Sequence, residues 1–326
     1  MRTALVLGQI SAVGPAAIDV YLPAMPLIAA DLVVPPFAVK GTLVAYFAGF
    51  GVAQLMYGPW SDQAGRRQPL LIGLALFAVA AVGCAIAQDV ATLTGFRTLQ
   101  GVGGRAVVVL PRAVIRDLHT GPEAARLMGV VMLVVVFSPM LVPLFGSLLL
   151  LVGPWQVLFA FLAALAVVAA MATIISHPET HPEEMRRPVV LRSLATDSAI
   201  LLRDTVCIGL TLIGGFGLGG FMVFLDNGTF VYSNVFGIGP TACSLAFAAN
   251  ALALFAASQG AARLLFALGA GRLIGLATAG FALCILTLLG LESLLGLSLA
   301  GLILGLFLAN TFLGLLLPVA VVLSLD

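Results

Sequence analysis

Uncharged stretches of about twenty residues follow one another along almost the whole sequence. A helix of about 20 apolar residues is long enough to cross the hydrocarbon core of a bilayer. Inside lipid, helices and closed barrels are the structures that satisfy all of their own backbone hydrogen bonds. Charged residues make up 9% of the chain, against roughly 25% in soluble domains. The sequence therefore predicts an all-α membrane protein.

The uncharged stretches predict ten membrane-spanning helices, separated by turns rich in glycine, proline and polar residues. The predicted spans cover residues 4–29, 41–61, 69–88, 91–116, 126–150, 155–176, 204–231, 241–262, 272–290 and 296–318. The first stretch continues through Asp19 and two prolines and lacks a convincing cleavage site. This favours a retained span over a removed signal peptide.

One long hydrophilic segment, from His177 to Asp204, separates six spans from four. Its prolines and mixed charges are typical of a linker. We therefore predict an N-terminal six-helix bundle over residues 1–176, a cytoplasmic linker over 177–203 and an incomplete C-terminal bundle over 204–326. The turn Gly269-Ala270-Gly271-Arg272 repeats the Gly/Arg character of the turn after the second span, as expected of transporters built from duplicated halves.

Positive charge is distributed unevenly between the two ends of the predicted spans. Lys40 lies at one end, whereas twelve arginines lie at the N-terminus or beside even-numbered turns: Arg2, Arg66, Arg67, Arg112, Arg116, Arg126, Arg186, Arg187, Arg192, Arg203, Arg263 and Arg272. Lys and Arg are enriched on cytoplasmic loops. The N-terminus and the even-numbered turns are therefore predicted to face the cytoplasm.

The stretch from Gly58 to Arg67 is predicted to form a tight turn between the second and third spans. Gly58 and Gly65 permit a sharp backbone path, and Arg66 and Arg67 anchor the turn on the cytoplasmic side. At the cytoplasmic end of the fourth span, Arg112, Arg116 and Asp117 are expected to meet this turn around Asp62.

Asp19, Arg97 and Asp226 are charged residues that lie within predicted spans, where a charge costs about 2.5 to 3.5 kcal/mol on insertion scales. Asp19 is interpreted either as a carboxylate that exchanges protons in a central cavity or as an interfacial cap before Pro23. Arg97 is interpreted either as a coupling partner for a nearby acid or as half of a structural ion pair. Asp226 either lines the cavity or caps the end of the seventh span.

The fourth span carries further polar and small residues around Arg97. The glycines at 101, 103 and 104 would let another helix approach closely. Arg105 is deeper than Arg112 and Arg116, and the sequence identifies no partner for it. The candidates for lining a cavity are Tyr21, Tyr46, Phe50 and Gln100, although aromatic residues in such a chain are more often packing residues.

Two prolines, Pro139 and Pro143, lie four residues apart in the fifth span, followed by Gly146. Proline removes a helical hydrogen bond, so a kink is expected here. The kink is interpreted either as part of a transport motif or as ordinary packing.

Four motifs together resemble the major facilitator superfamily and, within it, the Bcr/CflA branch of bacterial drug exporters. The first span contains Asp19, Tyr21, Leu22 and Pro23 of a D-x-Y-L-P motif, and the turn after the second contains Gly58, Ser61, Asp62, Gly65, Arg66 and Arg67. The fourth span matches at Arg97, Gln100, Gly101 and Gly103 and ends in Arg116-Asp117. The fifth matches an antiporter motif at Pro139, Pro143 and Gly146, but departs from it at Val142 and Ser147.

The resemblance implies proton-coupled multidrug efflux by alternating access across the bacterial inner membrane, with small amphipathic drugs and protons as partners and no cofactor or metal. It implies that Asp19 carries the proton, that Arg97 is its coupling partner, and that Asp62, Arg66 and Arg67 act as a conformational latch. A monomer is expected. The alternatives are a proton-coupled nutrient symporter, and a truncated inactive fragment or subunit.

The resemblance also implies twelve spans, of which the last two are not found in the ten predicted here. The exposed faces of the seventh, eighth and tenth spans would then need lipid, another chain or a rearrangement. An enzyme is not expected, because the sequence shows no nucleophile–base pair, phosphate loop or metal cluster. The run His177 to Glu184 is an unconvincing metal site, since its two prolines break the helix that would align the histidines.

Overall fold

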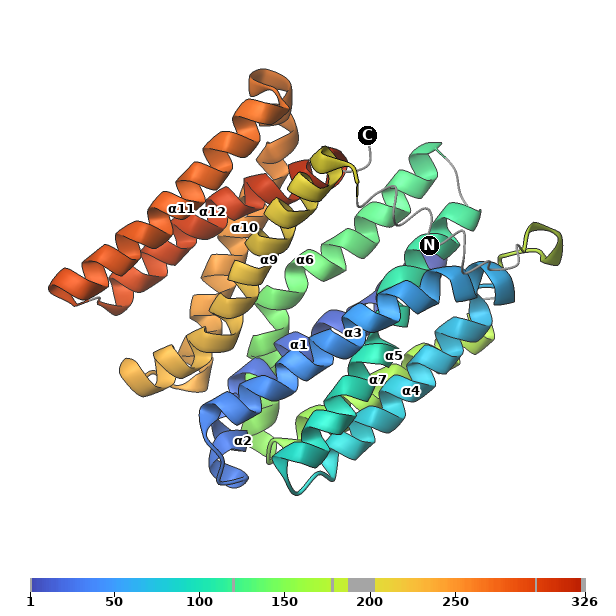
Figure 1. Ribbon diagram of the computed structural model, residues 1–326. Coiled ribbons are helices and arrows are strands. Elements are labelled where there is room, and N and C mark those ends of the chain that lie inside the picture. The colour runs from blue at the N-terminus through green and yellow to red at the C-terminus, as the bar shows by residue number, and fades with distance from the viewer. Residues whose placement is uncertain (1, 119–120, 177–178, 187–202, 297, 324–326) are drawn as a thin grey trace. The chain divides into compact units, whose positions relative to one another are not determined.

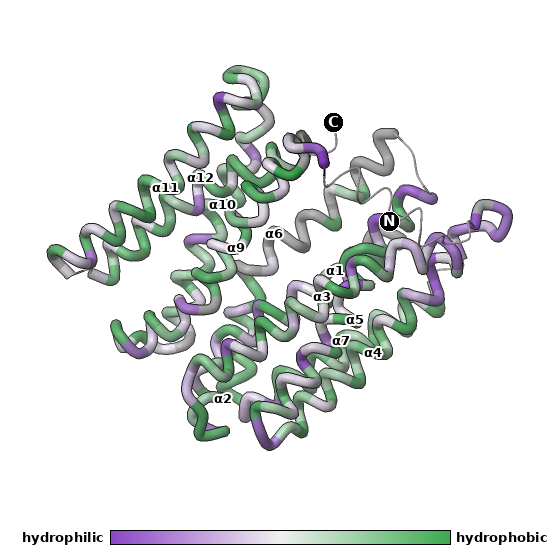
Figure 2. The backbone as a smooth tube through the Cα atoms, in the orientation of Figure 1, coloured by the Kyte–Doolittle hydropathy of each residue, from purple (hydrophilic) through white to green (hydrophobic). Residues whose placement is uncertain are grey.

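The computed structural model describes residues 2–118, 121–176, 179–186, 203–296 and 298–323, and the regular structure among them is helical throughout. The chain forms two compact units, Met1–Val189 and Val190–Asp326. The ribbon in Figure 1 follows the helices of each unit. In Figure 2 the helices are coloured mostly as hydrophobic along their length, as expected for segments that lie in lipid.

The first unit contains seven α-helices and two short 3-10 helices among its described residues. They are α1 (Arg2–Asp19), η1 (Leu22–Ala24), α2 (Met25–Asp31), α3 (Pro36–Ala64), α4 (Arg67–Ala85), α5 (Val90–Leu118), α6 (Gly121–Val152), α7 (Gln156–Ser176) and η2 (Glu183–Met185). Asp89 precedes α5, and its carboxylate accepts the backbone N–H of Thr92 at 2.8 Å. This bond caps one of the N–H groups that the first turn of a helix leaves unpaired.

The described residues of the second unit form four long helices and a short π-helical segment. They are α9 (Thr205–Phe230), η3 (Val231–Val235), α10 (Pro240–Leu268), α11 (Ala270–Leu295) and α12 (Leu299–Leu323). In this unit α12 packs against α9, α10 and α11. Between α10 and α12, the buried Asn310 donates a hydrogen bond to Asn250 at 3.1 Å.

Eight helical segments of the described residues are long and apolar enough to span a membrane. Helix α5 is not among them, because its four arginines lower its hydropathy, and α6 contributes the shorter apolar stretch Leu141–Val152. Each of the ten predicted spans nevertheless coincides with a long helix. The predicted all-α membrane fold is confirmed.

The first predicted span is not one uninterrupted helix. Helix α1 ends at Asp19, and η1 and α2 follow after a short turn. Pro23 and Pro26 lie at the starts of η1 and α2. Proline cannot donate a helical hydrogen bond and restricts the residue before it, which accounts for the break.

The predicted turn from Gly58 to Arg67 is much shorter than expected. Helix α3 continues through Pro59 to Ala64, so the connection to α4 consists of Gly65 and Arg66. Gly65 has a φ of 89°, a conformation that side chains other than glycine rarely adopt. Gly58 lies inside α3, where an added Cβ would meet no atom within 4 Å. Gly58 therefore makes no sharp turn.

Helix α5 packs against α1, α3, α4 and α6 in the first unit. A Cβ atom on Gly101 would lie 2.0 Å from the carbonyl oxygen of Tyr46, and one on Gly103 would lie 2.6 Å from that of Gly73. Backbone atoms of α3 and α4 thus occupy the space that side chains would need. The predicted close approach of helices at these glycines is confirmed.

Candidate functional site

Arg97 is fully buried in the first unit, enclosed by aromatic rings. Its guanidinium carbon lies 4.6 Å from the ring centres of both Tyr21 and Tyr46, and 5.9 Å from that of Phe159 in α7. A cation over an aromatic face is attracted by the ring quadrupole, most strongly where water is excluded. The rings therefore stabilise the positive charge of Arg97.

Hydrogen bonds hold one edge of the same guanidinium. The Nη1 group of Arg97 donates to the carbonyl oxygen of Ala17 at 3.0 Å and to Gln100 Oε1 at 2.7 Å. The Nε and Nη2 atoms of Arg97 are buried without a hydrogen-bond partner among the described residues. Two nitrogen atoms of the Arg97 guanidinium thus remain able to donate hydrogen bonds.

Asp19 ends α1 and is 3% exposed. Its Oδ2 accepts a hydrogen bond from the hydroxyl of Ser138 in α6 at 2.6 Å, and Asp19 forms no salt bridge with any described residue. The predicted pairing of Arg97 with a nearby acid is therefore not formed with Asp19 here. Ala17 and Asp19 are two residues apart in α1, which places them about 200° apart around the helix axis. The Ala17 carbonyl and the Asp19 side chain therefore contact different neighbours.

The predicted lining residues gather around Arg97. Tyr21, Tyr46 and Gln100 are each fully buried, and the Tyr46 hydroxyl donates to the carbonyl oxygen of Gly14 at 3.3 Å. Half-buried Phe50 stacks on Tyr46 with ring centres 6.0 Å apart. The structure therefore brings Arg97 together with the four predicted lining residues, and Asp19 lies two residues after Ala17, whose carbonyl oxygen binds Arg97.

Arg105 has a neighbour that the sequence did not reveal. Its guanidinium carbon lies 4.6 Å from the ring centre of Phe50. An aromatic face can stabilise a cation without an acidic partner. Phe50 is thus shared between the Arg97 cluster and Arg105.

The motif of the fifth predicted span lies in α6, beside Asp19. A Cβ on Gly146 would lie 2.7 Å from the carbonyl oxygen of Val20, so α6 approaches the end of α1 closely. Pro143 is buried, and neither Pro139 nor Pro143 interrupts α6. The side chain of Pro139 lies outside the described residues. Asp226 is in α9, and its side chain is likewise outside the described part of the chain.

A second polar cluster forms where α3, α4 and α5 meet. Arg66 donates from Nε to Asp117 at 2.8 Å and from Nη1 to Ser61 at 2.7 Å, and it forms a salt bridge with Asp62. Burial alone would lower the pKa of Arg66, but hydrogen bonds to Asp117 and Asp62 and the charges of both acids raise it above its usual value. Arg66 therefore stays protonated and ties three helices together.

Glu179, from the segment after α7, joins this cluster, although its role was not predicted from the sequence. Its carboxylate accepts the backbone N–H groups of Arg66 at 2.8 Å and of Arg67 at 3.1 Å. It also accepts those of Thr180 and His181 at 3.0 Å. Partial burial would raise the pKa of Glu179, but these four bonds hold it below the usual value. Glu179 thus caps the start of α4.

The other residues predicted for the turn have different outcomes. Arg67 donates to the carbonyl oxygen of Ile174 at 3.1 Å, which ties the start of α4 to the end of α7. The predicted meeting of the end of α5 with the Asp62 turn is formed by Asp117, which binds Arg66. Arg116 is exposed and forms no hydrogen bond or salt bridge with a described residue, so it takes no part in this meeting. Arg116 lies on a different side of α5 from its neighbour Asp117, which joins the cluster.

The polar run after α7 shows no metal-binding geometry in its described part. Across the described residues, no three His, Cys, Asp or Glu side chains are placed to hold a metal ion. Instead, Glu179 binds backbone N–H groups and His181 Nδ1 lies 3.9 Å from Asp117 Oδ2. Ser138, Phe159 and Glu179 are the residues of these clusters that sequence reasoning missed, since their partners are remote in the chain.

Curated relatives of this chain are membrane transport or drug-resistance proteins by name. The Bacillus subtilis "Uncharacterized MFS-type transporter YdgK" is 34% identical over 260 residues, which cover 79% of this chain and 65% of the relative. The Haemophilus influenzae "Bicyclomycin resistance protein homolog" is 31% identical over 234 residues, covering 72% and 59%. "Multidrug resistance protein D" of Escherichia coli is 31% identical over 245 residues, covering 74% and 61%. The matches thus span about three fifths of these relatives' lengths.

Solved structures of transporters have the same fold. The partially occluded inward-open xylose transporter XylE from E. coli superimposes with a TM-score of 0.78 at 16% identity, over 99% of this chain and 86% of that one. A D-xylose–proton symporter superimposes with a TM-score of 0.71 at 17% identity, over 98% and 80%.

The family model described as Major Facilitator Superfamily matches residues 9–326. That range contains both units, the Arg97 cluster and the Arg66 cluster. The B. subtilis relative and the two solved structures are named as transporters, in agreement with the prediction that the chain is not an enzyme. The chain belongs to the Major Facilitator Superfamily.

Proposed function

We propose that this chain carries out drug efflux coupled to proton entry, by alternating access across the bacterial inner membrane. Relatives named for resistance to bicyclomycin, to chloramphenicol and to multiple drugs support small amphipathic compounds as substrates. The chain spans about three fifths of those proteins. Because the match covers only part of each relative, drug export has to be measured with this chain rather than inferred from the relatives.

The observation that carries the proposal is the buried carboxyl group of Asp19, which no described cation neutralises. An unpaired charge is expensive inside a membrane. Asp19 therefore gains from binding a proton, and it can release that proton when water, substrate or a cation reaches it. The hydroxyl of Ser138 is 2.6 Å away and can accept a hydrogen bond from the protonated acid or donate one to the carboxylate.

Arg97 supplies the second half of the coupling. Its unused Nε and Nη2 donors offer hydrogen bonds to a carboxylate or to a polar group of the substrate. In the state described by the structure, the Ala17 carbonyl, Gln100 and the two tyrosine rings hold the guanidinium. A state in which Arg97 reaches Asp19 would favour loss of the proton, because an opposite charge stabilises the carboxylate.

The Arg66 cluster would act as the latch for one state of the transport cycle. It joins the ends of α3, α4 and α5 to Glu179 through charge-assisted hydrogen bonds, which are stronger than neutral ones. We place these ends and the N-terminus on the cytoplasmic side, because lysine and arginine are enriched there. Lys40 lies near the opposite end of α3.

The test is drug export by the purified chain in proteoliposomes with an imposed proton gradient. Asp19→Asn is expected to abolish gradient-driven export, while Asp89→Asn, at an exposed helix cap outside the cluster, retains it. Antiport also predicts that adding substrate releases protons from the unmodified protein in weak buffer, whereas a symporter would take them up. Export by Asp19→Asn at the unmodified rate would contradict the proposed role of Asp19.

A further inference from the structure

Arg105 lies near the middle of α5, far from either end of the helix. At about 1.5 Å per residue, it is about 22 Å from the start of α5 at Val90 and about 20 Å from its end at Leu118. A basic side chain near the end of a span can extend to the membrane surface, but one in the middle cannot. A charge at that depth is costly and commonly marks the path of a substrate or an ion. Arg105 therefore needs a counter-charge within the span.

Among the described residues, Arg105 has an aromatic neighbour but no acidic one. Its guanidinium carbon lies 4.6 Å from the ring centre of Phe50, and it forms no salt bridge with a described acid. Its Nε atom is buried without a hydrogen-bond partner in the described part of the chain. Asp19, the only buried acid among the described residues, is bound by Ser138. The charge of the half-buried Arg105 is thus not neutralised.

Two further arginines of α5 lie on the same side of the helix. Successive residues are rotated by about 100°, so Arg97, Arg105 and Arg112 fall within about 80° of one another around the axis. Arg112 is half-buried and forms no salt bridge with a described acid, and no described residue bonds its buried Nε atom. It therefore takes no part in the predicted meeting with the Asp62 turn. Three cations on one face create a positive potential that attracts anions.

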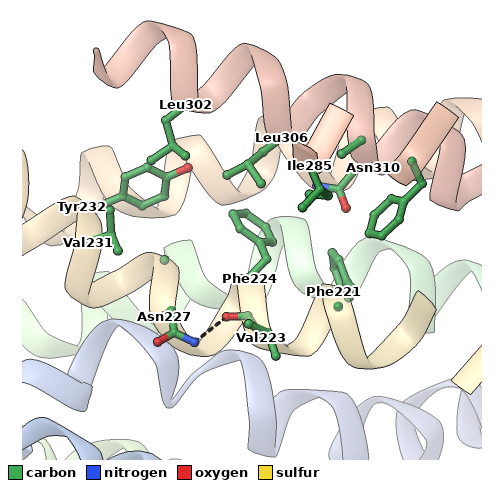
Figure 3. A pocket seen from close by; sticks show the side chains of 14 residues that line it. Phe221, Val223, Phe224, Asn227, Val231, Tyr232, Ile285, Leu302, Leu306 and Asn310 are labelled. Carbon is green, nitrogen blue, oxygen red and sulfur yellow. Dashed lines mark hydrogen bonds between the residues drawn. The ribbon is translucent and has the colours of Figure 1, made fainter. Parts of the chain in front are cut away.

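The cavity of the second unit has a different chemistry. It measures about 230 Å³, and most of the side chains that line it are aromatic or aliphatic. Asn227, Tyr232 and Asn310 supply its uncharged polar groups (Figure 3). None of its described lining residues is charged. An anionic group would find no counter-charge there, whereas the arginine face of α5 offers several.

The aromatic neighbour of Arg105 indicates what kind of anion would bind. Phe50 is half-buried and stacks on Tyr46, with ring centres 6.0 Å apart. A flat aromatic molecule can pack edge-to-face against the exposed part of the Phe50 ring, while its anionic group accepts hydrogen bonds from the guanidinium of Arg105. The planar fork of arginine fits a carboxylate especially well.

We propose that Arg105 binds the anionic group of a small aromatic organic anion, and that Arg112 helps to attract that anion. The inference rests on the proposed export function, for which it names a class of substrate. The anion supplies the negative charge that the described residues do not. The ring of Phe50 contacts the aromatic body of the same molecule.

The test compares two probes that differ in charge and have nearly the same shape. Naphthoate is an aromatic carboxylate, and naphthamide is its uncharged counterpart. Binding to the purified chain in phosphatidylcholine nanodiscs is measured by equilibrium dialysis at neutral pH, without a proton gradient. We expect naphthoate to bind about tenfold more tightly than naphthamide, because charge-assisted hydrogen bonds are stronger than neutral ones.

Variants of α5 assign the difference to particular arginines. Arg105→Gln should weaken naphthoate binding about tenfold and leave naphthamide binding unchanged, while Arg105→Lys, which keeps the charge, should recover part of the loss. Arg112→Gln should weaken naphthoate binding by less. Arg116→Gln removes the same charge at the exposed end of the same helix, and it should bind both probes as the unmodified chain does.

Thermal unfolding separates a binding role of Arg105 from a structural one. Without a probe, Arg105→Gln should unfold at or above the temperature of the unmodified chain, because it removes a costly charge that lacks a described partner. A lower unfolding temperature, equal affinities of the unmodified chain for the two probes, or unchanged naphthoate binding by Arg105→Gln would each overturn the proposal.

A lipid headgroup is the other source of an anion at this site. A rise in unfolding temperature on addition of phosphatidylglycerol that Arg105→Gln abolishes would assign the site to lipid, and it would also overturn the proposal. None of these readouts requires transport, so failure here is distinguishable from failure of the proposed function.

Discussion

At the scale of single residues, the first unit separates two opposite charges that its sequence suggested as a pair. Asp19 is bound by Ser138, and Arg97 is bound by carbonyl oxygens and tyrosine rings. Each charge thus has its own small set of neutral partners. Such an arrangement keeps both groups available for exchange of partners, because neither is committed to a buried ion pair, whose separation is costly.

The hydroxyl of Ser138 is predicted to position the Asp19 carboxyl group. Ser138→Ala removes a buried hydrogen bond to a charged group, worth about 1.5 to 3 kcal/mol, so we expect proton-driven export to fall at least about tenfold. Ser138→Thr, which keeps the hydroxyl, should recover most of the rate. Ser147→Ala is the matched control, because Ser147 bonds the carbonyl oxygen of Pro143 in its own helix. Drug exchange without a proton gradient should change little in Ser138→Ala. A general folding defect would instead lower exchange and proton-driven export together.

Glu179 gives a prediction that depends on pH. Its hydrogen bonds hold its pKa below the usual value in the folded protein. The stability that it contributes is therefore fully present above the unfolded pKa of about 4.3 and is lost as the pH falls through the lower folded value. Glu179→Gln is expected to destabilise the protein by about 1 kcal/mol at pH 7, since the site is partly exposed.

The measurement is thermal unfolding of the purified protein as a function of pH. The difference between Glu179→Gln and the unmodified chain should shrink below about pH 4. Glu184→Gln, at an exposed position nearby, should match the unmodified chain throughout. A difference that persisted unchanged at low pH would show that the lost charge is not its cause.

At the scale of elements, glycines set how helices turn and how closely they pack. Gly65 joins α3 to α4 with a φ of 89°, and Gly269 joins α10 to α11 with a φ of 77°. The two connections thus have the same kind of backbone conformation at corresponding places in the two units. This local similarity agrees with the helix contacts, since α3 packs on α4 and α5 as α10 packs on α11 and α12.

Gly65→Ala is expected to destabilise the first unit by about 1 to 3 kcal/mol. The conformation is unfavourable for alanine, and the new Cβ would lie 2.5 Å from Glu179 Oε2. Gly58→Ala is the control, because Gly58 lies in α3 with open space around it, and alanine there should stabilise the helix by about 0.5 to 1 kcal/mol. Unfolding in denaturant measures both. Equal effects of the two substitutions would contradict the assignment of the turn to Gly65.

Gly101→Ala tests the packing of α5 on α3. Its Cβ would lie 2.0 Å from the Tyr46 carbonyl oxygen, and overpacking in a close-packed interior costs about 1 to 3 kcal/mol. We expect a lower yield of folded protein and a lower melting temperature. Gly95→Ala, in the same helix with no atom within 4 Å of the added Cβ, should be tolerated. The comparison is made by size-exclusion chromatography and thermal unfolding.

At the scale of the whole molecule, the Arg66 cluster is predicted to bias the equilibrium between transport states. Asp117→Asn removes a charge from the cluster of Arg66, Asp62 and Asp117. We expect it to shift the populations of the two states about tenfold, which corresponds to 1.4 kcal/mol, and to slow export. Distance distributions between one spin label on each unit measure the populations.

Glu183→Gln is the matched control for this shift. Glu183 forms a salt bridge with Arg186 at 3.5 Å, and the Glu183 side chain is 87% exposed. Exposed pairs contribute little, so the populations should stay as in the unmodified chain. An unchanged distance distribution in Asp117→Asn would show that the cluster does not act in the transport cycle and has only a structural role.

Much of the architecture followed from sequence, and the errors have physical causes. All ten predicted spans coincide with helices, because apolar length is a local property of the chain. The misplaced ends have causes in local backbone chemistry: α3 tolerates Pro59 within the helix, whereas Pro23 and Pro26 accompany the break after α1. In the candidate site, the sequence singled out Asp19, Arg97, Asp62 and Arg66 as costly or distinctive residues and placed Asp117 beside the Asp62 turn, but it did not identify the other partners.

The order of residues along the chain is enough to predict a bundle of membrane helices with a few charged groups inside, because lipid requires every span to be long and apolar and to satisfy its own backbone hydrogen bonds. The tertiary structure decided which groups those charges contact. Ser138 is 119 residues from Asp19, and Glu179 is 113 residues from Arg66. Contacts at such separations depend on how each helix is rotated and how closely glycines let it approach its neighbours. Those two quantities are set by the packing of the whole unit.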